Sequence, residues 1–189
     1  MTHTFPRHTN LFFSAHYEII TQAMVHPYQN TVHATIIPEG IEEIGEGAFE
    51  GCANLRTIQL PSSLKRIGDH AFKKCYNLTF ISIPDSVYSI GRQAFYQCTK
   101  LAIITLPKNI TVIADGTFRC CKNLSFLSIP TSVTSIHRNA FSGCTKLLHI
   151  NLPNNIRTIQ SHAFSFCIKL SSITIPDNIT TIEKYTFYR

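Results

Sequence analysis

The chain carries seven cysteines and nine histidines, the side chains most often used for metal binding and nucleophilic catalysis. Six of the cysteines recur every 23 residues, at positions 52, 75, 98, 121, 144 and 167. Equivalent positions in a stack of repeats form a row, whereas a tetrahedral zinc site needs ligands that converge on one point. These six cysteines are therefore predicted to be buried thiols that pack as small apolar side chains.

Cys120 is the one cysteine outside this spacing. It lies between Arg119 and Cys121 and close to Lys122, and neighbouring positive charge favours a thiolate. An enzymatic role for Cys120 is one hypothesis, and a merely exposed thiol is the simpler interpretation. A catalytic group must break the repeat at one place, and the sequence has no cluster of Ser or Cys with His and an acid that does so. We predict a protein without catalytic residues, which is not an enzyme.

Five of the nine histidines, His3, His8, His16, His26 and His33, lie near the start of the chain at irregular spacing. His16 and Glu18 form an H-x-E pair, but no P-C-x-x-C segment follows to complete a deaminase-type zinc site. The H-E-x-x-H pattern of zinc peptidases is absent as well. The sequence predicts no metal site, no cofactor and no small-molecule substrate.

The cysteine spacing belongs to a repeat that governs most of the chain. Prolines recur from 38 to 176, phenylalanines from 49 to 187 and leucines from 55 to 170, always in steps of 23. One unit reads L-x-x-I-x-[IL]-P-x-[SN]-[VIL]-x-x-I-x-x-x-A-F-x-x-C-x-x. The first part predicts a short strand that proline ends, and A-F-x-x-C predicts one turn of 3₁₀- or α-helix. Such units bury their apolar sides only by stacking, at about 4.8 Å per parallel strand.

This unit resembles the BspA-type class of leucine-rich repeats, which also has 23-residue repeats. The similarity covers about residues 32–189 and implies a curved, right-handed solenoid of about seven coils. Short parallel strands are expected on one face and short 3₁₀ or α turns on the other. In related repeats, the residue eight positions after the first leucine forms a hydrogen-bonded ladder inside the bend. The resemblance implies this role for Ser63, Ser86, Asn109, Ser132, Asn155 and Asn178.

The two ends of the repeat array need separate interpretations. Residues 1–31 do not fit the repeat and are predicted to form an N-terminal cap, with a helix from about Leu11 to Val25. At the other end, Tyr185, Phe187 and Tyr188 either close the core or leave a surface for self-association.

The outward positions of the strands are the predicted binding site. The residue two positions after each leucine points away from the core, and three successive members are apolar. This first column contains Thr57, Phe80, Ile103, Phe126, His149 and Ser172. The next outward column is polar and uncharged, with Gln59, Ser82, Thr105, Ser128, Asn151 and Thr174. An apolar ridge beside a hydrogen-bonding row predicts a protein partner on the strand (concave) face.

Charge supplies the alternative hypothesis. The net charge is +6, with one base and six acids in residues 1–50 (−5) and sixteen bases and five acids in residues 51–189 (+11). Many bases lie away from the outward strand positions, at Lys73, Lys74, Lys100, Lys122, Lys146 and Lys169. This lysine-bearing face could bind a polyanion, namely nucleic acid, a sulfated glycan or an anionic membrane. Nucleic acid is disfavoured because only two tyrosines, Tyr76 and Tyr96, are near enough to stack on bases.

The leading prediction is a non-enzymatic protein-binding module. The resemblance implies an interaction, adhesion, surface-antigen or host-interaction role, at the cell surface or in a host-exposed place. The sequence itself has no apolar run of about 18 residues and no recognisable signal peptide, so no transmembrane segment is expected. Free thiols favour a reducing compartment instead. The sequence therefore leaves two alternatives for the compartment, the cell surface and a reducing interior.

Overall fold

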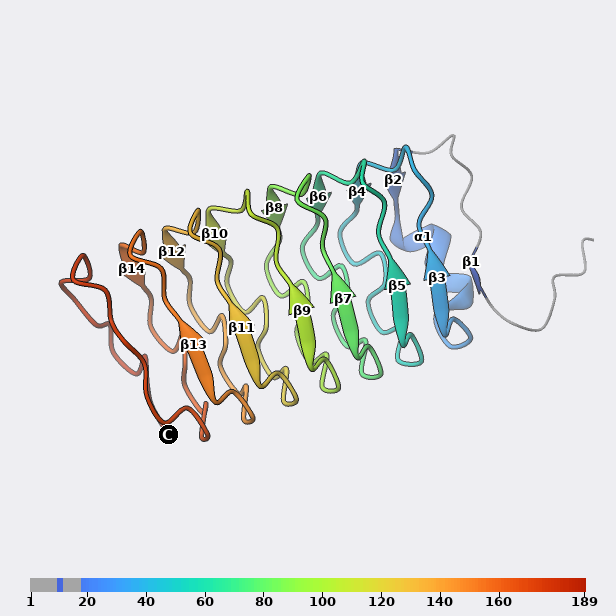
Figure 1. Ribbon diagram of the computed structural model, residues 1–189. Helices are drawn as coiled ribbons and strands as arrows, with labels where there is room; N and C mark the ends of the chain where they lie inside the picture. Colours follow the sequence, from blue (N-terminus) through green and yellow to red (C-terminus); the bar gives the residue numbers. More distant parts are fainter. Residues whose placement is uncertain (1–9, 12–17) are drawn as a thin grey trace, which may run out of the picture.

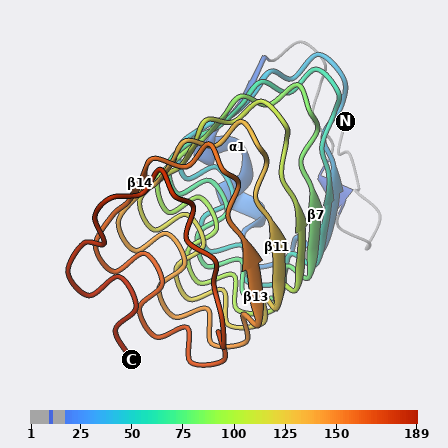
Figure 2. The ribbon, with the colours of Figure 1, turned by 60° about the vertical axis from the view of Figure 1, so that its left-hand side comes forward.

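The chain winds into a solenoid of stacked coils (Figure 1), seen in a computed structural model that describes residues 10–11 and 18–189. One face carries the three-residue strands β3 (Ala34–Ile36), β5 (Thr57–Gln59), β7 (Phe80–Ser82), β9 (Ile103–Thr105), β11 (Phe126–Ser128) and β13 (His149–Asn151). A second row holds the two-residue strands β2 (Ile19–Ile20), β4 (Glu43–Ile44), β6 (Arg66–Ile67), β8 (Ser89–Ile90), β10 (Val112–Ile113), β12 (Ser135–Ile136) and β14 (Thr158–Ile159). Figure 2 shows successive coils with nearly the same outline, the long strands on one side.

All strand pairs are parallel, and within the repeats their register advances by one unit. Phe80 pairs with Ile103 and Phe126 pairs with His149, each 23 residues further on. The second row keeps the same step, because Ile67 pairs with Ile90. This second row was not foreseen, since a two-residue strand leaves almost no alternation of apolar residues to read.

The core consists of identical side chains stacked in columns. The phenylalanine rings from Phe49 to Phe187 stack in sequence with centroids 5.3–5.7 Å apart and planes within 15° of parallel. The repeated leucine, isoleucine, alanine and cysteine positions are buried beside them. The contact of Phe72 with Phe95, and of Phe95 with Phe118, confirms the predicted in-register stacking of 23-residue units.

The A-F-x-x-C segments form turns opposite the strands, as expected, but these turns are not helical. Cys98 N donates to the carbonyl of Phe95 (3.1 Å), which closes a single turn. The neighbouring amides donate instead to the next coil, as Phe72 N does to the carbonyl of Ala94 (2.8 Å). Two residues per coil adopt a left-handed backbone, for example Gln93 (φ 51°) and Gln97 (φ 59°). A right-handed helix cannot continue through such residues, so the prediction of helical turns is corrected.

The predicted helix from Leu11 to Val25 is wrong over most of its described residues. Leu11 lies in β1 (Asn10–Leu11), Ile19 and Ile20 form β2, and helix α1 contains only Gln22–Val25, followed by the 3₁₀ helix η1 (His26–Tyr28). Phe12 and His16, assigned to the inner face of that helix, lie outside the described residues.

The physical reason is the exposed backbone edge of the first complete coil. β1 pairs with β3, and β2 pairs with β4, so the edge of each ladder gains partners. Gly45 N, for instance, donates to the carbonyl of Ile20 (2.8 Å). Ile20 and Val25 are buried at the same time. Edge pairing and burial together outweigh the modest helix preference of a short segment.

Residues 171–189 form the last coil, in which no strand is assigned. Phe187 stacks on Phe164 with ring centroids 5.6 Å apart and so extends the phenylalanine column. Tyr185 and Tyr188 remain exposed and meet edge to face. Self-association through this surface stays a prediction.

Candidate protein-binding face

The first outward column lies where the sequence predicts it. Phe80, Ile103 and Phe126 are 45%, 60% and 56% exposed, although each belongs to a strand whose central residue is buried. Parallel register brings them onto successive strands, where Phe80 pairs with Ile103. Thr57 and His149 continue the column at its two ends and are exposed. The three large apolar side chains thus form a ridge across β7, β9 and β11.

The second outward column is polar in the middle and apolar at one end. Its polar members are all exposed and carry hydroxyl or amide groups: Gln59, Ser82, Thr105, Ser128 and Asn151. Ile36 pairs with Gln59 and is 59% exposed, so it extends the same column into β3. Ile36 was missed because its coil lacks the leading leucine from which the column was counted. Ser172 and Thr174 are exposed as well, but they lie outside any assigned strand.

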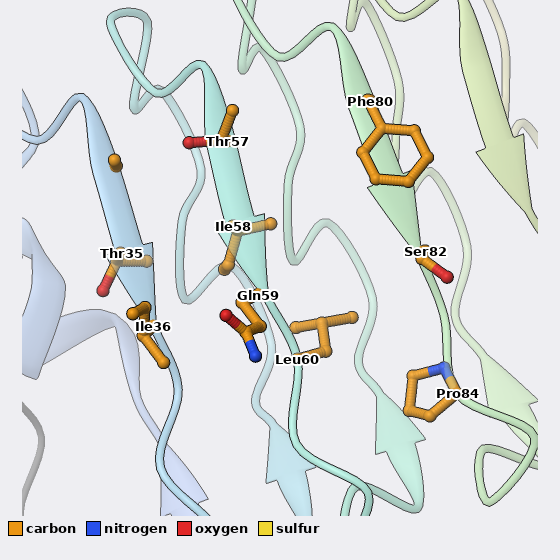
Figure 3. A pocket seen from close by; sticks show the side chains of 10 residues that line it. Thr35, Ile36, Thr57, Ile58, Gln59, Leu60, Phe80, Ser82 and Pro84 are labelled. Atoms are coloured by element: carbon orange, nitrogen blue, oxygen red, sulfur yellow. The ribbon is translucent and has the colours of Figure 1, made fainter.

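A groove of about 560 Å³ opens between these columns near the start of the array (Figure 3). Ile36 and Phe80 supply apolar walls, while Thr57, Gln59 and Ser82 supply polar groups. A smaller hollow of about 260 Å³ lies at the other end of the face, lined in part by His149, Asn151 and Thr174. Shallow hollows that mix apolar walls with a few polar groups suit a side chain of a partner.

The strand face carries no formal charge. Its twelve outward positions from β3 to β13 contain no Asp, Glu, Lys or Arg, although these types make up 15% of the chain. Aromatic and aliphatic side chains with few charges characterise the centre of protein interfaces. The face offers contact area and hydrogen bonds, and His149 is the titratable side chain among its twelve outward positions.

The positions assigned to the bend ladder do form bonds between coils. Asn109 Nδ2 donates to the carbonyl of Asp85 (2.7 Å), and Asn155 Nδ2 donates to the carbonyl of Thr131 (2.8 Å). Asn178 makes the equivalent bond to the carbonyl of Asn154, whereas Ser63 and Ser132 donate to the carbonyls of Ile41 and Ile110, a different position of the preceding coil. Ser86 occupies the same position in its coil and is exposed. These side chains link the bends and leave the strand face unobstructed.

A second side-chain ladder was missed by sequence reasoning. The Sγ–H of Cys75 donates to the carbonyl of Phe49, and four later cysteines repeat this bond at the same distance of 3.1 Å. Burial raises the pKa of the Cys52 and Cys167 thiols to about 12 and raises those of Cys75, Cys98, Cys121 and Cys144 as well. The signal was the use of cysteine in six coils, where an apolar residue alone would fill the space but could not donate.

Cys120 and His162, two further residues with reactive side chains, make contacts that stabilise the turns. Cys120 is half-buried in a turn with a left-handed backbone (φ 62°), and its thiol lies against Gly143. His162 Nδ1 is 3.1 Å from Ser165 Oγ, but that hydroxyl is buried and donates to the carbonyl of Tyr185 (2.6 Å). Within residues 10–11 and 18–189, no group of three or more His, Cys, Asp and Glu residues is arranged to hold a metal ion.

The acidic and basic residues of the first two complete coils pair with each other. Lys65, Arg66 and Lys73 form ion pairs with acids of the preceding coil at Glu42, Glu43 and Glu50. Glu39 accepts hydrogen bonds from the amides of Ser62 and Ser63, and the Ser62 amide lowers the pKa of its carboxyl most. The acids at the start of the array thus pair with bases at the equivalent positions of the next coil. The Lys65–Glu42 pair is exposed and contributes little stability, whereas Lys73 and Glu50 are half-buried.

None of the helices in the described part of the chain has the length and apolar character that crossing a bilayer requires.

Comparisons with known proteins agree with this architecture. The profile of the BspA type leucine rich repeat region matches in six copies, over residues 18–123 and 65–189. No curated protein matched the sequence.

Solved structures of leucine-rich repeat proteins are similar over most of the chain. A protein from Eubacterium ventriosum is 29% identical with a TM-score of 0.76, over 84% of this chain and 43% of that one. The T. pallidum leucine-rich repeat protein is 29% identical with a TM-score of 0.75, over 88% of this chain and 76% of that one. The chain spans less than half the length of the Eubacterium protein. From its repeats, its fold and its profile match, the chain belongs to the BspA-type leucine-rich repeat family.

Proposed function

We propose that this chain is a non-enzymatic protein-binding module, of the interaction or adhesion type, which holds its partner on the strand face. The observation that carries the proposal is the ridge of Phe80, Ile103 and Phe126, which lies exposed on a face without formal charge. Three large apolar side chains at one coil spacing make a contiguous exposed apolar stripe. Such stripes on soluble proteins mark surfaces that a partner covers.

The energetics favour a partner with apolar side chains of its own. Covering an exposed aromatic or branched aliphatic side chain contributes about 1.5–3 kcal/mol when burial is complete. Aromatic anchors often carry most of the affinity of an interface. The groove beside Ile36 and Phe80 has room for an inserted side chain, and Gln59 and Ser82 on its walls can orient it by hydrogen bonds.

The family supports the broad class of function. Leucine-rich repeat proteins commonly serve as protein-interaction or adhesion scaffolds, and repeat solenoids use extended faces for binding. By analogy with the family, the proposal includes display at a cell surface or contact with a host. The free thiols favour the competing expectation of a reducing compartment.

The test is quantitative capture of partners with a variant and its matched control. Phe80→Asp/Phe126→Asp places two charges in the ridge, while Ile168→Asp/Ile182→Asp places two charges at exposed apolar positions elsewhere. We expect proteins enriched by the wild type to be lost with the first variant and kept with the second. Labelled mass spectrometry of the captured proteins gives the ratio, and the purified partner then gives the affinity.

The comparison also has an outcome that contradicts the proposal. If both variants retain the same proteins at equal ratios, the partner binds elsewhere on the solenoid. Thermal unfolding of both variants checks that the coils remain folded, because all four positions are exposed in the wild type.

A further inference from the structure

One edge of the solenoid separates positive from negative charge. Five coils turn back from a buried phenylalanine toward the strand face through residues 70–79, 93–102, 116–125, 139–148 and 162–171. These five segments, called the turn edge below, contain no Asp or Glu. They contain seven bases, namely Lys73, Lys74, Lys100, Arg119, Lys122, Lys146 and Lys169. The acids of the same coils lie outside these segments, with Asp85 and Asp177 in the bends and Asp69 and Asp115 immediately before two of the segments.

Four of these bases form a lysine row. Lys100, Lys122, Lys146 and Lys169 lie one per coil on four consecutive coils, and all four are exposed. Among the residues that the structure describes, none of the four takes part in an ion pair. Lys100, Lys146 and Lys169 share one repeat position, and Lys122 precedes it by one residue. At one coil per strand spacing, the backbone carries one lysine about every 5 Å over roughly 15 Å.

The backbone that carries the row is fixed by the core. Each lysine lies between a buried cysteine and a buried leucine, as Lys100 does between Cys98 and Leu101. Leu101 N donates to the carbonyl of Cys98 (3.0 Å), and Lys100 N donates to the carbonyl of Tyr76 in the preceding coil (3.2 Å). The spacing of the backbone that carries the lysines is therefore set by the solenoid and not by a flexible loop.

We propose that the lysine row binds a linear sulfated polysaccharide. A line of unpaired cations, one on each of four successive coils, complements a chain that carries anions along its length, and displaced counterions supply the driving force. The side chains between the lysines, Thr99, Asn123 and Thr145, offer hydroxyl and amide groups suited to sugar hydroxyls. The site is separate from the apolar ridge and does not depend on the proposed protein partner.

The surroundings of the row favour a polysaccharide over other polyanions. Binding of single-stranded nucleic acid relies on aromatic side chains between the cations. In the turn edge, exposed aromatic side chains lie only toward the ends of the row, at Tyr76 and Phe166. Its middle, from Thr99 to Lys146, contains the buried Phe118 and Phe141 and the exposed Phe126 of the strand-face ridge. A bilayer presents anions over a plane, whereas the four lysines follow one line.

Heparin is the probe, and its affinity is measured by titration calorimetry over a series of salt concentrations. We expect log K to fall linearly with log salt, with a slope of about −3 for four neutralised charges. Lys122→Gln/Lys146→Gln should weaken binding at least tenfold at low salt and reduce the slope by about half. The control Lys108→Gln/Arg157→Gln removes the same net charge from exposed positions outside the turn edge and should change the affinity less than twofold.

Several outcomes overturn the proposal. Equal weakening by both double variants means that net charge, and not the row, attracts heparin. A thymidine oligonucleotide of equal charge that binds more tightly than heparin assigns the edge to nucleic acid. Binding to vesicles with anionic lipid that heparin does not compete assigns it to membranes, and absence of heparin binding at low salt removes the site. Unchanged heparin affinity of Phe80→Asp/Phe126→Asp separates this result from the fate of the strand face.

Discussion

Phe118 and Phe126 are the same residue type, eight positions apart, and they have opposite surroundings. Phe118 is fully buried between the rings of Phe95 and Phe141, at 5.7 and 5.5 Å. Phe126 stands 56% exposed on β11. The inward column contains phenylalanine in all seven coils, whereas the outward column changes type from coil to coil. Inward positions maintain the stack, and outward positions are free to encode recognition.

The strongest test of this contrast replaces each phenylalanine by alanine. Phe118→Ala removes a ring that two neighbours contact, and we expect the free energy of unfolding to fall by about 3–5 kcal/mol. Phe126→Ala removes mostly solvated area, so its change should stay within about 0.5 kcal/mol. Urea unfolding followed by circular dichroism measures both. Similar losses in the two variants would mean that the ridge is part of the core.

The repeat explains why so much of the fold could be predicted. Each inward column is written six or seven times, so a single ambiguous position does not alter the assignment of the strand, the bend or the core. The outward ridge followed from the same count, because side chains alternate along a strand. The coils themselves can therefore be predicted from the sequence.

The features that the sequence did not predict are contacts between coils, which the pattern within one repeat does not contain. Cys75 reveals its bond to the Phe49 carbonyl only when the coils are stacked. The pairing of Glu43 with Arg66 also joins neighbouring coils, although both charges were visible in the sequence. Leu11 and Ile19 pair with a strand edge that the local sequence does not describe. Local propensity could not anticipate these contacts between coils.

A second test asks whether the inward cysteines stabilise the stack as neutral thiols. Burial raises the pKa of Cys167 from its ordinary value of 9.0 to about 12. A group with a raised pKa in the folded state contributes stability that is complete below pH 9 and is lost as the pH rises toward 12. We expect the wild type to lose about 1.4 kcal/mol per pH unit more than Cys167→Ala in this range. Urea unfolding at pH 7, 9 and 10.5 measures the difference.

The control for this test changes the core without changing its titration. Ile159→Val removes one buried methyl group and should lower the free energy of unfolding by about 0.5–1.5 kcal/mol at every pH. Parallel pH profiles for the wild type and Cys167→Ala would show that this thiol is not buried in solution as it is in the stack.

The third test concerns positions whose residue type varies between coils although their backbone conformation stays the same. Gln97, Cys120 and Gly143 are equivalent positions of three successive coils, and all have a left-handed backbone. Gln97 N donates to the carbonyl of Arg119 (2.8 Å), so the ladder holds this conformation in spite of the side chain. Gln97→Gly removes the clash of Cβ with its own backbone. We expect a gain of roughly 0.5–1 kcal/mol in the free energy of unfolding, measured by urea unfolding.

The reverse change at Gly143 completes this comparison, because the two sites share backbone geometry and differ only in their residue. An alanine Cβ at Gly143 would lie 3.1 Å from Cys120 Sγ and would adopt φ near 77°, so Gly143→Ala should destabilise by about 1 kcal/mol. Opposite signs for the two substitutions would separate backbone constraint from side-chain packing at a single column. A loss of stability in both variants would mean that contacts of the Gln97 side chain stabilise the fold by more than its backbone strain destabilises it. Residue type at this turn position would then be constrained by packing as well as by backbone conformation.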